Sequence, residues 1–196
     1  MYIRYRGVNH RKAELYNKFL KKLAFDLDSH LILKGQAERL KEELRELKIK
    51  ERTLRESKDG AKTELVYQGA MLKELRGGAN DDRMDAFCSA LEKYRGLLNF
   101  YNGVSKELVL TQFTIDAYTA EKKRICKTIA KDEEDLCAQL EQFASLAKNI
   151  ESELGVDVGS ENFLKAIEVT PTGKSVGKLR NVSYINLRMV KEQPQA

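Results

Sequence analysis

A heptad repeat over residues 33–75 is the feature that most constrains how this chain can fold. Positions that alternate at spacings of four and three are apolar in ten of thirteen cases, against about five or six expected from an apolar content of 42%. The thirteen positions are Leu33, Ala37, Leu40, Leu44, Leu47, Glu51, Leu54, Lys58, Ala61, Leu65, Gln68, Leu72 and Leu75. Because a and d residues of a coiled-coil seam have this spacing, we expect one long helix that pairs with a second helix.

A glycine-rich turn at residues 76–82 follows this seam. Gly77 suits the left-handed position after a helix, and Asn80 or Asp81 suits the cap at the start of the next one. A second apolar seam then recurs at helical spacing from Met84 through Leu98 and Tyr101 to Leu154, with an interruption at Asn102-Gly103. A similar break precedes the first seam, at residues 26–29. The expected helices therefore span residues 9–27, 30–76, 81–101 and 105–154.

These helices predict a mainly α fold of long antiparallel coiled-coil helices, since a short turn makes two long helices antiparallel neighbours. The expected shape is a kinked rod. The alternative is a four-helix bundle, which requires the chain to fold back at Asn102-Gly103. Only two prolines and no tryptophan occur, and 33% of the residues are charged, which argues against a β-sandwich or barrel.

The last forty residues differ in character from the helical part. Two segments, 163–169 and 179–190, are richer in β-branched residues and flank a turn-like sequence at 170–173. We predict a short C-terminal β-hairpin or extended tail. The chain then divides into a helical coiled-coil hairpin over residues 1–155 and a β or extended docking tail over residues 156–196.

Residues that could carry catalysis or bind a metal are few and scattered. Neither histidine lies near a cysteine at zinc-ligand spacing, and no serine has a nucleophile motif around it. Gly173-Lys174-Ser175 is preceded by Glu168 where a phosphate-binding loop has its first glycine. The chain is therefore expected to have no enzymatic activity, no cofactor and no metal.

Cysteine usage and hydropathy bear on the compartment. Cys88, Cys126 and Cys137 all lie inside helical patterns, so we expect reduced thiols and a cytoplasmic or nuclear location. No window of 18 consecutive apolar residues occurs, so no membrane span is expected. The net charge of the chain is +5.

The first 25 residues hold seven of the basic side chains against a single acid, Glu14, with tyrosines interleaved. Such a segment can bind phosphates or an acidic protein partner. A lone hairpin also cannot bury the apolar residues of the tail by itself. The candidate partner-binding residues are therefore Arg4, Arg6, Arg11 and Lys12 in the basic segment and Tyr184, Ile185 and Leu187 in the tail.

We expect a non-enzymatic structural or adaptor subunit of a multi-protein assembly. It would bind a protein partner or a second copy through its helical seams, basic end and tail. One alternative is a nucleic-acid-associated coiled-coil protein that uses the basic N-terminal segment. In outline the chain also resembles antiparallel coiled-coil hairpins such as the central stalks of rotary ATPases and stalk-like proteins of export machines. That resemblance implies a stalk-like subunit as a further alternative.

Overall fold

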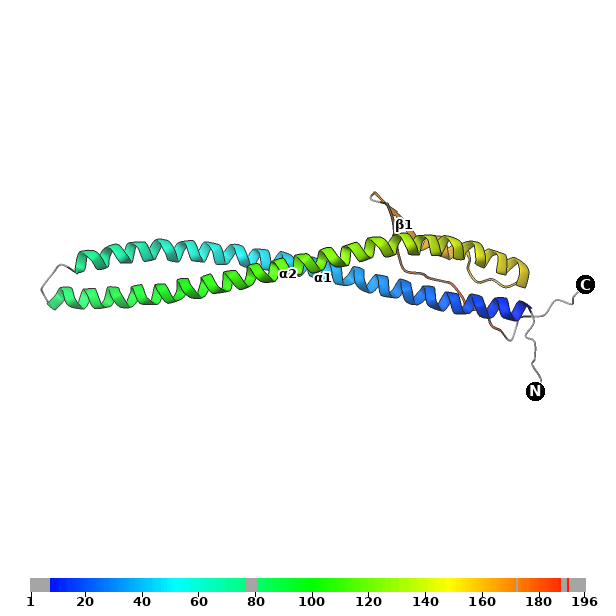
Figure 1. Ribbon diagram of the computed structural model, residues 1–196, viewed down its shortest axis with the longest axis horizontal. Helices are drawn as coiled ribbons and strands as arrows, with labels where there is room; N and C mark the ends of the chain where they lie inside the picture. Colours follow the sequence, from blue (N-terminus) through cyan, green and yellow to red (C-terminus); the bar gives the residue numbers. More distant parts are fainter. Residues whose placement is uncertain (1–7, 77–80, 172, 188–189, 191–196) are drawn as a thin grey trace, which may run out of the picture. The chain divides into compact units, whose positions relative to one another are not determined.

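The computed structural model describes residues 8–76, 81–171, 173–187 and 190 of the chain. Its elements are α1 (Val8–Leu75), α2 (Asp81–Leu154), α3 (Glu161–Lys165), β1 (Ile167–Thr170) and β2 (Gly173–Val176) (Figure 1). The two strands form an antiparallel hairpin in which Ile167 pairs with Val176 and Thr170 with Gly173. The predicted fold class, mainly α with two long helices and a short C-terminal hairpin, is confirmed. None of the described helices is long and apolar enough to span a membrane.

The chain divides into two compact units, each described here by itself. Unit 1 contains Met1–Glu38 and Arg124–Ala196, and unit 2 contains Arg39–Lys123. Within each unit a stretch of α1 and a stretch of α2 run side by side in opposite directions (Figure 1). The C-terminal tail belongs to unit 1.

The predicted seam of α1 is confirmed, because all thirteen positions between residues 33 and 75 are buried or half-buried. Its two charged members have partners on α2 within unit 2. Gln112 Nε2 donates a hydrogen bond to Glu51 Oε1 at 3.2 Å, and Lys58 Nζ lies 5.6 Å from the centre of the Tyr101 ring. Cation–π and hydrogen-bond contacts of this kind give Glu51 and Lys58 partners at their half-buried seam positions.

Both helix breaks predicted from the sequence are wrong. α1 continues through residues 26–29, and α2 continues through Asn102-Gly103. The cause is the seam itself: His30 follows Leu27 by three residues and is buried, and Val104 follows Tyr101 by three and is also buried. The register of buried seam positions is thus unbroken at both places. The four-helix alternative required a turn at Asn102-Gly103, where the structure has helix.

The first part of the α2 seam is also corrected in two positions. Met84 and Leu98 were assigned to it, but they are 61% and 38% exposed. Ala90 is buried and Leu97 is half-buried, so they face α1 in their place. The remaining predicted seam residues of α2, from Tyr101 to Leu154, are all buried or half-buried.

The core of unit 1 combines both helices with the tail. α1 and α2 contribute Tyr16, Leu20, Leu23, Leu27, Leu136, Leu140, Ala144, Ala147 and Ile150, among others, and the tail contributes Val158, Phe163, Ala166, Val176, Ile185 and Val190. The Phe163 ring is fully buried and stacks on Phe143 with the ring centres 5.8 Å apart. The tail is therefore one side of the hydrophobic core of this unit.

Candidate functional site

The predicted basic site is only partly within the described residues. Arg4 and Arg6 lie outside them. Arg11 and Lys12 are exposed near the start of α1. Lys12 Nζ lies 2.5 Å from a carboxylate oxygen of Glu153 on α2. The positive charge of Lys12 is therefore offset by a partner within unit 1.

The three candidate residues of the tail differ in accessibility. Tyr184 is 55% exposed, Leu187 is half-buried and Ile185 is buried. Asn17 on α1 holds the backbone of Ile185 from both sides. Its Nδ2 donates to the Ile185 carbonyl, and its Oδ1 accepts from the Ile185 N–H, each at 2.8 Å. Of the three, Tyr184 offers the most side-chain surface to a partner.

The loop that leads from α2 into the tail is held by one carboxylate. Glu151 accepts hydrogen bonds from the Val158 and Ser160 N–H groups, each at 3.0 Å, and from the Ser160 hydroxyl at 2.6 Å. Burial raises the pKa of Glu151, but the hydrogen bonds from Ser160, Val158 and Gly159 outweigh burial and lower it. Gly159 has φ of +77°, and a Cβ there would lie 2.4 Å from the Asn181 carbonyl oxygen. These contacts fix the path of the chain from Val158 to Ser160, at the start of the tail.

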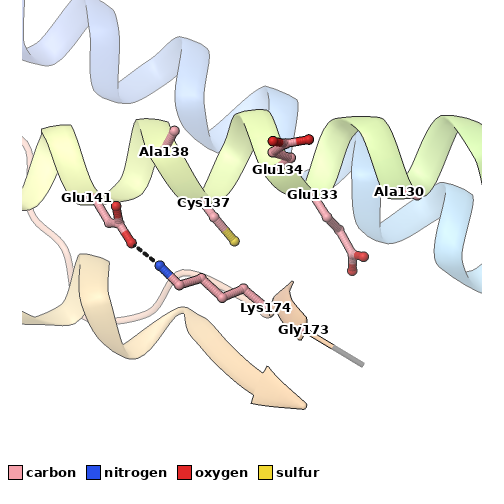
Figure 2. Close-up of a pocket in the computed structure, with 8 residues that line it drawn as sticks. All are labelled: Ala130, Glu133, Glu134, Cys137, Ala138, Glu141, Gly173 and Lys174. Atoms are coloured by element: carbon pink, nitrogen blue, oxygen red, sulfur yellow. Dashed lines mark hydrogen bonds and ion pairs between the residues drawn. The ribbon is translucent and has the colours of Figure 1, made fainter. Parts of the chain in front are cut away.

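A pocket of about 400 Å³ lies between α2 and the hairpin (Figure 2). Figure 2 shows Lys174 of β2 reaching toward Glu141 of α2, with Cys137 beside them, and the Lys174 Nζ–Glu141 Oε1 distance is 2.5 Å. Burial raises the pKa of the Cys137 thiol, which keeps it protonated at neutral pH and weakens it as a nucleophile or metal ligand. The lysine of this pocket, Lys174, and one of its carboxylates, Glu141, form an ion pair with each other.

In the described part of the chain, no group of three or more His, Cys, Asp or Glu side chains is placed to hold a metal ion. All three cysteines are free thiols, with Cys88 and Cys126 exposed.

Sequence reasoning missed a polar cluster inside unit 1. His30 on α1 is 1% exposed, and its Nε2 lies 3.6 Å from Glu133 Oε1 on α2. The same Glu133 oxygen lies 2.8 Å from Lys34 Nζ, which also donates to the Val176 carbonyl of β2 at 3.2 Å. The signal that could have found it is the seam register, because His30 stands three residues after Leu27.

A second missed feature is an apolar patch on α2 within unit 2. Val109, Leu110 and Phe113 are 63%, 67% and 74% exposed, and we call these three residues the outer apolar face. At 100° per residue they lie within about a third of the helix circumference. The buried seam residues Leu108 and Thr111 point to the opposite side. The helical periodicity of the sequence was enough to place Val109, Leu110 and Phe113 opposite the seam.

Unit 1 has a smaller apolar groove between its two helices. The groove has a volume of about 270 Å³, and its lining includes Leu15, Phe19, Leu146 and Ile150. Leu15 and Phe19 are nearly half exposed. The Phe19 and Phe143 rings meet edge to face, with centres 6.5 Å apart.

Comparison with known proteins gives no family, since no family model, curated protein or solved structure matches the chain. The functional argument therefore depends on the geometry above.

Proposed function

We propose that this chain is a non-enzymatic coiled-coil structural or adaptor subunit that binds other proteins through the outer apolar face of α2. The observation that carries the proposal is the exposure of Val109, Leu110 and Phe113 on the side of the helix away from its own seam. Contiguous exposed apolar residues on a folded chain mark interaction surfaces far more often than scattered ones do.

The size of this face indicates what kind of partner it needs. Full burial of a Val, Leu or Phe side chain contributes about 1.5–3 kcal/mol, and roughly two thirds of each remains to be buried. The three residues together therefore contribute about 3–6 kcal/mol before the cost of association. A micromolar complex needs about 8 kcal/mol net. The partner must therefore cover more of α2 than these three side chains, as a second helix laid along it would.

The proposed absence of catalysis has two supports in unit 1. The polar groups of the pocket in Figure 2 include Lys174 and Glu141, which are paired with each other. Cys137 is held in its protonated form by burial, which raises its pKa. We also propose a reducing compartment, the cytoplasm or nucleus, because the three cysteines are free thiols.

Additional contacts at the basic end and tail are part of the proposal. Arg11 and Tyr184 are exposed and suit an acidic protein partner. The nucleic-acid alternative has less support, because Glu153 offsets the charge of Lys12. The stalk-like alternative rests on the outline of two long antiparallel helices alone.

The test compares co-purifying proteins from the wild type with those from Phe113→Asp and from Val66→Asp. Val66 is 69% exposed on α1 of the same unit, outside the outer apolar face, so it is a matched control. We expect Phe113→Asp to lose specific partners, or a second copy of the chain, while Val66→Asp keeps them. Equal partner sets for all three proteins would refute the proposed surface. Salt-dependent binding to random-sequence DNA or RNA would favour the nucleic-acid alternative instead.

A further inference from the structure

His30, Lys34, Glu133 and the Val176 carbonyl connect three elements of unit 1, and we call them the His30 cluster. Lys34 lies one helical turn after His30 on α1, and its ammonium contacts both Glu133 of α2 and Val176 of β2. Glu133 Oε1 is therefore shared: it lies 2.8 Å from Lys34 Nζ and 3.6 Å from His30 Nε2. The shorter distance belongs to the lysine, which holds the hairpin.

The imidazole of His30 is in a setting that favours its neutral form. Both ring nitrogens are buried and make no hydrogen bond to a described protein group. Burial lowers the pKa of His30 and Lys34 lowers it further, while Glu133 and Asp132 oppose them without reversing the shift. The charged groups that face the ring or line the cavity beside it are Asp26 and Lys34 from α1 and Asp132, Glu133 and Asp135 from α2. From β2, the Val176 carbonyl contacts Lys34.

We propose that the His30 cluster is a pH switch that loosens the β-hairpin from α1 when His30 takes up a proton. The proton comes from solvent and goes to an imidazole nitrogen. The resulting imidazolium draws the shared Glu133 carboxylate away from Lys34. Lys34 then faces a second cation one turn away on α1, and its hold on the Val176 carbonyl weakens.

The direction of the pH dependence follows from linkage. We call the form with the hairpin held on α1 closed and the form with the hairpin loosened open. The closed form has a lowered His30 pKa, so it binds fewer protons than the open form does. The closed form is therefore fully favoured above the ordinary histidine pKa of about 6.5, and it loses stability as the pH falls below that value. The closed form loses no further stability once the pH is below its own, lowered His30 pKa.

The other end of the tail supplies an internal control. Asn17, which holds the Ile185 backbone, precedes His30 by thirteen residues on α1, or about 20 Å along the helix. The switch should therefore act on the hairpin and leave the Ile185 contact closed.

The experiment measures amide hydrogen exchange of the full chain by NMR between pH 7.5 and 5.5, corrected for the intrinsic pH dependence of exchange. The reporter is the Gly177 N–H, which donates to the Ala166 carbonyl at 2.8 Å, and the control is the Ile185 N–H. We expect Gly177 protection to fall by up to tenfold per pH unit below about 6.5, with Ile185 protection unchanged. His30→Leu should abolish this dependence, and His10→Leu, at the other histidine, should preserve it.

The wild-type protein alone keeps the proposal falsifiable if His30→Leu fails to fold. The His30 ring proton resonances should titrate with a midpoint below 6.5, over the same range in which Gly177 loses protection. A midpoint at or above 6.5, constant Gly177 protection, or an equal loss at Ile185 would each overturn the switch. Persistence of the pH dependence in a folded His30→Leu protein would overturn it as well.

Discussion

Replacing Phe163 with alanine tests whether the tail is part of the core of unit 1. The ring is fully buried, stacks on Phe143 at 5.8 Å, and through Phe143 is connected to Phe19. Truncating a buried phenylalanine costs about 3–5 kcal/mol, because lost transfer energy and the remaining cavity add. The free energy lost with the Phe143–Phe163 ring pair is already included in that range. We expect Phe163→Ala to destabilise unit 1 by about 4 kcal/mol.

The matched control is Leu164→Ala on the same short helix, where the side chain is 52% exposed. This change should cost no more than about 1 kcal/mol. Urea unfolding followed by circular dichroism gives the total loss, and hydrogen exchange assigns it to amides of unit 1 or unit 2, because the two units need not unfold together. Equal losses for both variants, or a loss confined to unit 2, would refute the role of the tail in the core.

Three further predictions concern the seam, the loop and its carboxylate. Leu44→Asp buries a charge in the seam, so it should lower the free energy of unfolding by about 3 kcal/mol or more. Arg45→Asp should lower it by about 0.5 kcal/mol or less. Equal losses in thermal or urea unfolding would contradict the seam register. Gly159→Ala should destabilise more than Gly155→Ala, because both have positive φ but only Gly159 has the Asn181 oxygen in the way; equal unfolding midpoints would contradict this. The lowered pKa of Glu151 stabilises the chain at neutral pH and ceases to do so as the pH falls through that pKa, so Glu151→Gln should reduce the acid sensitivity of unfolding; an unchanged pH profile would count against it.

The seams could be predicted because heptad spacing reports directly on burial. Leu44 and Ala61 were placed by that spacing alone, and both are buried. The errors arose where local residue preference was given more weight than register. Glycine in a helix costs about 1 kcal/mol, which suggested a break at Asn102-Gly103. Packing of the continuous seam, with Val104 buried directly after it, outweighs that cost.

The tail could be predicted in kind but not in position. The sequence suggested strands at 163–169 and 179–190, whereas the structure has β1 at Ile167–Thr170 and β2 at Gly173–Val176. The residues after β2 follow a path fixed by partners far away in the sequence, such as Asn17, which holds Ile185. A side chain 168 positions away leaves no local signal in the segment that it holds.

The candidate sites also divide into features that a sequence pattern shows and features that depend on contacts between distant residues. The basic segment was visible as composition, but the Glu153 partner of Lys12 required the antiparallel pairing of α1 and α2. His30 was judged by its distance from the cysteines, although its seam position was the informative property. The outer apolar face was within reach of helical periodicity, because Val109, Leu110 and Phe113 fall opposite the seam.

Site-specific photo-crosslinking at the outer apolar face tests the central claim most directly. A photoreactive phenylalanine analogue would replace Phe113 in one protein and Val66 in another, and both would be irradiated in cells. We predict that position 113 forms a crosslink to one defined protein, or to a second copy of the chain, and that position 66 does not. The same faint products at both positions would contradict the claim that this face of α2 binds a partner.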